Sequence, residues 1–297
     1  MSPAALRLDA VRSRLGAAIF ARVAGSDGAA TRARVHLTPG PRWFDEDAAI
    51  RRVHGDAAMF VGGLRALLLQ SLHPLAMAAV AGHSGFRGDP WGRLQRTSTF
   101  LAFTTFGTVA DAEAAVARVC AVHDTVSGTT GTGEPYAASD PHLLGWVHVA
   151  EVDSFLAAHQ VYGARPLDQV GRDQYVAEAA RVATALGVVD PPVDEAGLTV
   201  RLDAYNAELR STAEARAAAR FLLLRPPIPT AARPAYAVLA AAAVGLMPRW
   251  SRWPLRLPYL PLTEATVVRA AGWSITSGIR FALTPVPSSR AGAPAAA

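Results

Sequence analysis

The segment DPHLLGWVHVAEVDSFLAAHQVY, residues 140–162, has the pattern of one long helix. Asp140 followed by Pro141 is typical of an N-cap and a first helical position. Apolar side chains then recur at helical spacing as far as Tyr162. The helix also holds Glu151, and its apolar face carries His148 and His159, which are close to three helical turns apart. This segment therefore predicts a helix with a buried face that contains polar side chains.

Further helical patterns occur on both sides of this segment, separated by breaks rich in glycine and proline. They are expected at 6–23, 46–80, 94–106, 110–127, 167–187, 195–222, 231–247 and 263–282. Pro74 is expected to kink or break the 46–80 helix just before the proline, and 128–141 is expected to be a loop. No strand-like alternation of useful length occurs. The sequence predicts an all-α, multi-helix globular fold with a lead-in at 1–44, a helical domain at 45–284 and a disordered tail at 285–297.

The composition excludes several classes of protein. Half of the residues are hydrophobic and 18% are charged, which is unlike a disordered chain. The net charge is +5, and every positively charged side chain is an arginine, because the chain contains no lysine. These arginines are scattered along the sequence, so no nucleic-acid partner is expected. The most apolar late segment, 236–247, has about 12 residues against the roughly 20 that a spanning helix needs, so no transmembrane helix is expected. No secretory signal is recognisable, which favours a cytoplasmic location.

The most informative of the eight histidines is His123. It lies on a helical stripe that is otherwise formed by Val116, Val119, Cys120 and Val126. Burying an imidazole costs free energy unless its nitrogens have partners. A hydrogen bond inside the core and a metal ion would both satisfy this requirement. Because Cys120 is the single cysteine, an intramolecular disulfide and a cysteine-based zinc site are both excluded.

Two arginines and a threonine form a second group. Arg93, Arg96 and Thr97, in the string GRLQRT, share one helical face. Guanidinium groups near apolar surface need anionic partners. These are either aspartate and glutamate side chains or, if a cofactor is bound, haem propionates or oxygen bound to a metal.

Several strings in this order and spacing resemble the MpaB-type oxygenases, the family that includes the latex-clearing rubber oxygenases. They are RALLLQSLHP at 65–74, GHSGFRGDPWGRLQRT at 82–97, FGT at 106–108, VHDTVSG at 122–128, YAASDPHLLGWVHVAEVDSF at 136–155 and YGARPL at 162–167. The resemblance runs from about residue 45 to about residue 285 and covers nearly the whole helical domain.

The resemblance implies an all-helical fold that holds haem b and uses O₂ to cleave carbon–carbon double bonds in isoprenoid chains. His123 best matches the histidine that binds the iron, and His148 is the alternative ligand. Arg93, Arg96 and Thr97 match the distal R-x-x-K-T pattern, with Arg96 in place of the lysine. A guanidinium stays charged, so Arg96 is expected to contact bound oxygen or a propionate and not to bind iron. The family's catalytic carboxylate has no counterpart before Arg93, since no glutamate occurs between Glu46 and Glu113.

Three functional hypotheses follow. The first is a haem b oxygenase that binds O₂ and a small lipophilic, isoprenoid-like substrate. The second is a haem-binding sensor or carrier that lacks oxygenase activity. The third is a metal-free helical protein with a lipid pocket, in which all eight histidines are core or surface residues.

Overall fold

The computed structural model describes residues 3–83 and 88–284, and it is 71% helical with two short strands. The all-α prediction is confirmed. The α-helices are α1 (Pro3–Ala24), α2 (Gly28–Leu37), α3 (Ala49–His54), α4 (Met59–Gln70), α5 (Pro74–His83), α6 (Pro90–Phe106), α7 (Val109–His123), α8 (Pro141–Tyr162), α9 (Gln169–Ala185), α10 (Glu195–Ala204), α11 (Ala213–Leu224), α12 (Arg233–Gly245), α13 (Arg249–Arg252), α14 (Pro261–Thr263) and α15 (Arg269–Leu283). Short 3₁₀ turns η1 (Tyr205–Ala207) and η2 (Thr230–Ala232) and a π-helical turn η3 (Glu264–Val268) complete them.

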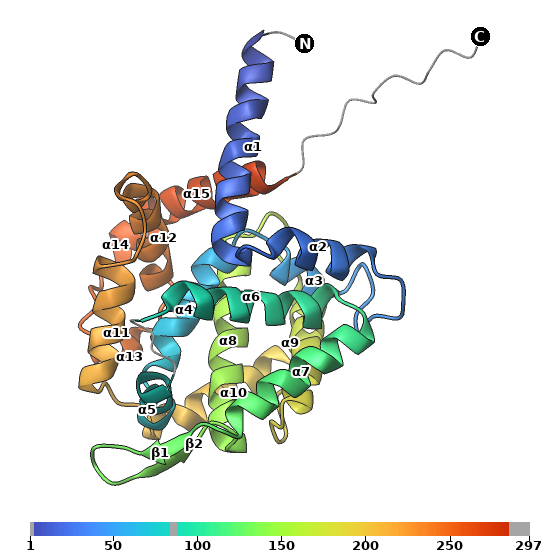
Figure 1. Ribbon diagram of the computed structural model, residues 1–297. Coiled ribbons are helices and arrows are strands. Elements are labelled where there is room, and N and C mark those ends of the chain that lie inside the picture. The colour runs from blue at the N-terminus through green and yellow to red at the C-terminus, as the bar shows by residue number, and fades with distance from the viewer. Residues whose placement is uncertain (1–2, 84–87, 285–297) are drawn as a thin grey trace.

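Helix α8 runs through the middle of the molecule, with α4 and α9 packed against it (Figure 1). The Asp140 carboxylate caps it by accepting a hydrogen bond from the backbone N–H of His142, and Pro141 occupies its first turn, as the sequence predicts. The side chains of Trp146 and Tyr162 are almost completely buried. Because residues on several sides of α8 are buried, its apolar character is not confined to one stripe.

A cluster of buried apolar side chains packs α12 and α15 against α4 and against the end of α8. Close approach to α15 depends on two glycines. A Cβ atom at Gly272 would lie 2.6 Å from the ring of Tyr162, and one at Gly16 would lie 2.3 Å from the carbonyl oxygen of Ala282. Part of the lead-in therefore packs onto the other helices, since α1 contacts α15 and α6, and α2 contacts α6.

The single helix expected at 46–80 is wrong, although the predicted break at Pro74 is confirmed. A further break separates α3 from α4 at residues 55–58. In this break the Asp56 carboxylate accepts hydrogen bonds from the backbone N–H of Ala58 at 2.8 Å and of Ala164 at 3.1 Å. It also pairs with Arg280 at 2.8 Å. Tertiary partners thus stabilise a turn that the apolar periodicity does not reveal.

Two further expectations are corrected. The helix expected at 195–222 is interrupted between α10 and α11, where η1 and an irregular segment intervene. The loop expected at 128–141 contains part of an antiparallel hairpin, β1 (Ser127–Thr129) and β2 (Pro135–Ala137), with Gly133 at a φ of 88° in its turn. The expected disordered tail at 285–297 lies outside the described residues.

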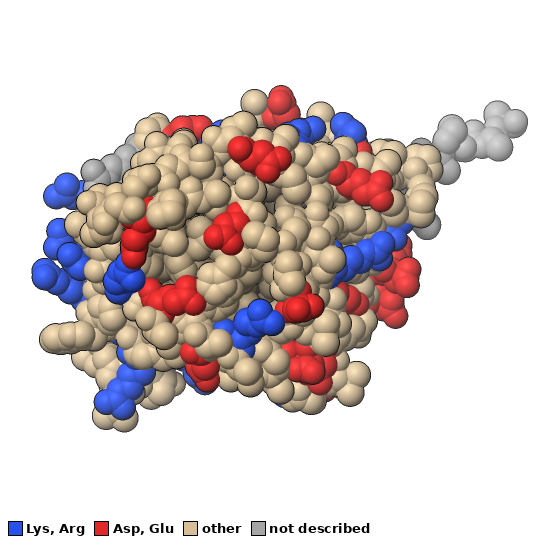
Figure 2. All heavy atoms as spheres, turned by 90° about the horizontal axis from the view of Figure 1, so that it is seen from below, with Lys and Arg blue, Asp and Glu red and all other residues tan. Residues whose placement is uncertain are grey.

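Among the described residues, no single helix is both long and apolar enough to cross a membrane; α4 and α5 would pass this test only as a pair, and they are bent by 105°. Acidic and basic side chains both occur on the face seen in Figure 2, and most of the surface between them is formed by uncharged residues. The low fraction of charged residues is therefore visible on this face.

Candidate active site

A largely apolar pocket lies between α8 and the helices that surround it on one side. The free space in it that a water-sized molecule can occupy is about 100 Å³. Its walls come from α3, α6, α7, α8, α9 and the segment after α9, and the residues are Ile50, His54, Phe100, Leu101, Thr104, His123, Leu144, Val147, His148, Glu151, Val152, Phe155, Tyr175, Ala179, Val182, Ala183, Leu186 and Val188. A small set of polar groups in an apolar pocket is typical of a site for a cofactor or a lipophilic ligand.

His123 and His148 reach this pocket from different helices. His123 is the last residue of α7, and His148 lies in the second turn of α8. The Nδ1 atom of His123 and the Nε2 atom of His148 are buried and have no hydrogen-bond partner among the described residues. Burial lowers the pKa of His123 and lowers that of His148 to about 4. Both imidazoles are therefore neutral near pH 7, which is the form that binds metals.

Glu151 adds an acid to the same wall. It lies one turn after His148 on α8, so both side chains point to the same side of the helix. Burial raises the pKa of Glu151 to about 7. This carboxyl group can therefore hold or release a proton at neutral pH, as a general acid or base must.

His54 is the third histidine of the pocket, and it has partners. Its Nδ1 atom lies 2.8 Å from Thr105 Oγ1, and its Nε2 atom lies 3.4 Å from the hydroxyl of Tyr175. Burial, followed by the nearby His159, lowers the pKa of His54 to about 3. His54 is therefore a neutral group fixed by hydrogen bonds, and its two nitrogens are already engaged.

The distal residues expected from the sequence lie elsewhere on α6. Arg96 is exposed and its guanidinium donates a hydrogen bond to Asp89 Oδ2 at 3.3 Å, and Thr97 is also exposed. Arg93 is partly buried, and burial followed by the charge of Arg96 lowers its pKa. The described walls of the pocket include Phe100, Leu101 and Thr104 from this helix, and none of the three predicted residues. The structure brings His123 and His148 together but does not bring the two arginines or the threonine to them.

Two other residues from the sequence analysis are also outside the pocket walls. Cys120 is partly buried one turn before His123 on α7. His159 is 1% exposed and lies further along α8, against Gly163. Sequence reasoning missed the role of Glu151 as a wall residue. Its position three residues after His148, on the same face of a largely apolar helix, is the signal that could have found it.

Comparison with known protein families matches residues 51–277 to the description "ER-bound oxygenase mpaB/B'/Rubber oxygenase, catalytic domain". The chain belongs to this family. The match covers most of the chain and confirms the MpaB-type resemblance. It includes every residue of the pocket walls except Ile50. Comparisons with curated proteins and with solved structures gave no match. The MpaB-type chain therefore carries the catalytic domain of an oxygenase family, and its pocket lies within that domain.

Proposed function

We propose that the protein is a haem b-dependent oxygenase that acts on a lipophilic, isoprenoid-like substrate. The observation that carries the proposal is the pair of histidines with unpartnered buried nitrogens, His123 and His148, in one apolar pocket of an oxygenase-family domain. An imidazole nitrogen without a partner in a buried site costs free energy, and coordination to iron would remove that cost. The donor set and the apolar character of the walls therefore suit a haem, and the walls would have to move apart to admit it, because the free space between them is about 100 Å³.

His123 would hold the iron from the end of α7. A neutral histidine imidazole is a common ligand of haem iron. His148 is the alternative ligand, since it lines the same pocket with an equally unpartnered nitrogen. A bound haem would supply the iron at which O₂ is activated.

The other groups of the pocket would act on the substrate and on protons. The apolar side chains would exclude water and accept a lipophilic chain. Glu151, with a pKa of about 7, would hold or release a proton inside the pocket. In this proposal Glu151 supplies the carboxyl group that the sequence lacks before Arg93. The sequence predicts that the distal residues bind oxygen or a haem propionate. They are Arg93, Arg96 and Thr97, and they could do so only if α6 moved them toward the pocket when haem binds.

The test compares four proteins after identical purification: wild type, His123→Ala, His148→Ala and Cys120→Ala. The intensity of the Soret absorption band per protein chain measures bound haem, and circular dichroism confirms that each variant is folded. We expect His123→Ala to lose most of its haem and Cys120→Ala to retain it. Haem loss only in His148→Ala would make His148 the ligand instead.

Two further outcomes decide between the function classes. Absence of a Soret band in wild-type protein, even after incubation with haemin, would contradict haem binding and favour a metal-free lipid-binding protein. A haem-loaded protein that consumes no O₂ with any unsaturated isoprenoid would be a sensor or carrier. Oxygen consumption with such a substrate, lost in His123→Ala, would support the oxygenase.

A further inference from the structure

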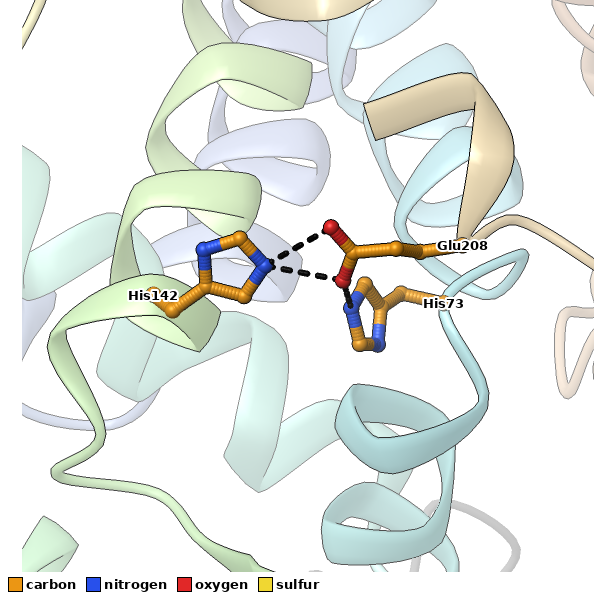
Figure 3. Close-up of side chains that lie close together, drawn as sticks. All are labelled: His73, His142 and Glu208. Atoms are coloured by element: carbon orange, nitrogen blue, oxygen red, sulfur yellow. Dashed lines mark hydrogen bonds and ion pairs between the residues drawn. The ribbon is translucent and has the colours of Figure 1, made fainter. Parts of the chain in front are cut away.

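Three potential metal ligands converge at a place outside the pocket walls. His73 lies in the turn between α4 and α5, His142 lies in the first turn of α8, and Glu208 follows η1. Figure 3 shows the Glu208 carboxylate between the imidazole ring of His142 on one side and that of His73 below it. His142 and Glu208 are 66 positions apart in the sequence, and His73 and Glu208 are 135 positions apart. The cluster therefore exists only in the folded chain.

The distances between the ligand atoms are close to those of a metal site. The Nε2 atom of His73 lies 3.2 Å from Glu208 Oε2, and the Nε2 atom of His142 lies 2.8 Å from the same oxygen. One ligand atom from each residue lies within 4.8 Å of the others. Tetrahedral zinc with bonds of about 2.0–2.2 Å places its ligand atoms about 3.3–3.6 Å apart. Small side-chain movements would thus admit an ion.

The surrounding packing fixes two of the ligands. His73 is 2% exposed, and its ring lies 6.2 Å from that of Trp146. The ring of His142 lies 4.9 Å from that of Tyr205, whose hydroxyl donates a hydrogen bond to the His142 carbonyl at 2.9 Å. These contacts orient His73 and His142 before any ion binds, which favours binding by reducing its entropy cost.

The neighbouring charges are compatible with a cation. The positively charged side chain nearby is that of Arg210, and its guanidinium pairs with Glu134 at 2.9 Å. The backbone N–H of Arg210 donates a hydrogen bond to the carbonyl oxygen of Leu72. Glu208 is the carboxylate that both histidines contact. The side chains of His142 and Glu208 are 55% and 42% exposed, so an ion could enter from solvent and keep a water molecule as a further ligand.

We propose that His73, His142 and Glu208 bind one divalent transition-metal ion, separate from the haem pocket. Two imidazoles and one carboxylate are the donor set of open zinc sites and of non-haem Fe²⁺ sites, whereas Mg²⁺ and Ca²⁺ prefer oxygen ligands. The ion would link the start of α5, the start of α8 and the segment after η1. Since α8 also carries His148 and Glu151, the ion would stabilise the helix that supports the pocket.

The test uses the full-length protein after treatment with EDTA. Zn²⁺ binding is measured by isothermal titration calorimetry, Co²⁺ binding by its visible absorption spectrum, and Fe²⁺ binding under anaerobic conditions. We expect one ion per chain and a higher unfolding temperature with the ion than without it. His142→Ala and Glu208→Gln should each weaken binding by about tenfold or more, in line with the cost of disturbing a metal site. Both residues are partly or largely exposed, so these variants should fold.

Two control variants separate this site from other histidines. His36 is exposed on α2, outside the cluster, and His148 lies in the pocket. His36→Ala and His148→Ala should bind the ion like wild type. Binding that survives His142→Ala and Glu208→Gln, or that is lost in His148→Ala, would overturn the proposal, as would failure of Zn²⁺, Co²⁺ and Fe²⁺ to bind wild-type protein. Tighter binding of Zn²⁺ would identify a stabilising zinc site, and tighter binding of Fe²⁺ a non-haem iron site.

Discussion

Glu151 is a partly buried acid in a helix whose neighbouring wall residues are mostly apolar. Its raised pKa follows from burial alone, because no charged partner offsets the loss of hydration. A carboxyl group that titrates near pH 7 destabilises the folded protein at higher pH. Strongly shifted pKa values are frequent at functional sites, in keeping with the proton-transfer role that we propose for Glu151.

The first prediction concerns the pH dependence of stability in haem-free protein. The folded state keeps the Glu151 proton up to about pH 7, whereas an unfolded glutamate loses it near pH 4.5. The folded state thus binds more protons in this window, and the contribution of Glu151 to stability falls as pH rises. Glu151→Gln removes this contribution. We expect the variant to gain stability relative to wild type between about pH 4.5 and about pH 7, by at most about 3 kcal/mol.

Urea unfolding of both proteins across this pH range measures the effect. His54 and His148 act in the opposite direction, because their lowered pKa values make stability rise with pH. These histidines are present in both proteins, so their contributions cancel in the difference. Glu113→Gln is the matched control, since Glu113 is exposed on α7. A constant difference between Glu151→Gln and wild type would show that Glu151 ionises normally.

At the scale of elements, the contact between α4 and α8 determines where the pocket wall lies. Gly62 of α4 lies directly against α8, where a Cβ atom would be 2.9 Å from the ring of Phe155 and 3.2 Å from the carbonyl oxygen of Ser154. Phe155 is also a wall residue of the pocket. Arg65, one turn later on α4, donates to Ser154 Oγ at 2.7 Å and pairs with Asp153 at 2.6 Å. A close backbone approach and a buried ion pair together align the two helices.

The second prediction compares two adjacent glycines of α4. Gly62→Ala forces the new methyl group against the backbone and ring of α8, so we expect a loss of about 1–3 kcal/mol. A Cβ atom at Gly63 meets no atom within 4 Å. Gly63→Ala should therefore stabilise the protein by about 0.4–1 kcal/mol, because alanine favours the helix and restricts the unfolded chain.

Chemical denaturation of the two variants and wild type tests this pair. Because Gly62→Ala displaces Phe155, it should also reduce haem content if the pocket binds haem, whereas Gly63→Ala should not. Equal stability of the two variants would show that α4 and α8 can separate without cost at this crossing.

At the scale of the whole molecule, the pocket is assembled from α3, α6, α7, α8 and α9 and the segment that follows. None of these elements forms a pocket alone. A ligand of the pocket thus binds the folded chain and not the unfolded one, and it must stabilise the fold by mass action.

The third prediction is a stabilisation of the protein by haem. At a free haem concentration about 100 times its Kd, the gain is about 2.7 kcal/mol, which raises the unfolding temperature by roughly 4 °C in a chain of 297 residues. Differential scanning calorimetry of apo and haem-loaded protein measures the shift. His123→Ala should show little of it. An unchanged unfolding temperature in wild-type protein that contains haem would place the haem outside the folded core.

The sequence by itself determined the helical class, the limits of α8 and its Asp140 cap, because periodicity and capping are local properties. It also selected His123 and His148, since a polar group on an apolar helical face needs a partner wherever that face packs. Only the tertiary structure decided which residues meet. It brought Glu151 to the pocket wall, left Arg96 and Thr97 on the surface, and joined His73, His142 and Glu208 into one cluster. These contacts depend on how distant helices cross and on the break at Asp56, and neither is encoded in the periodicity of one segment.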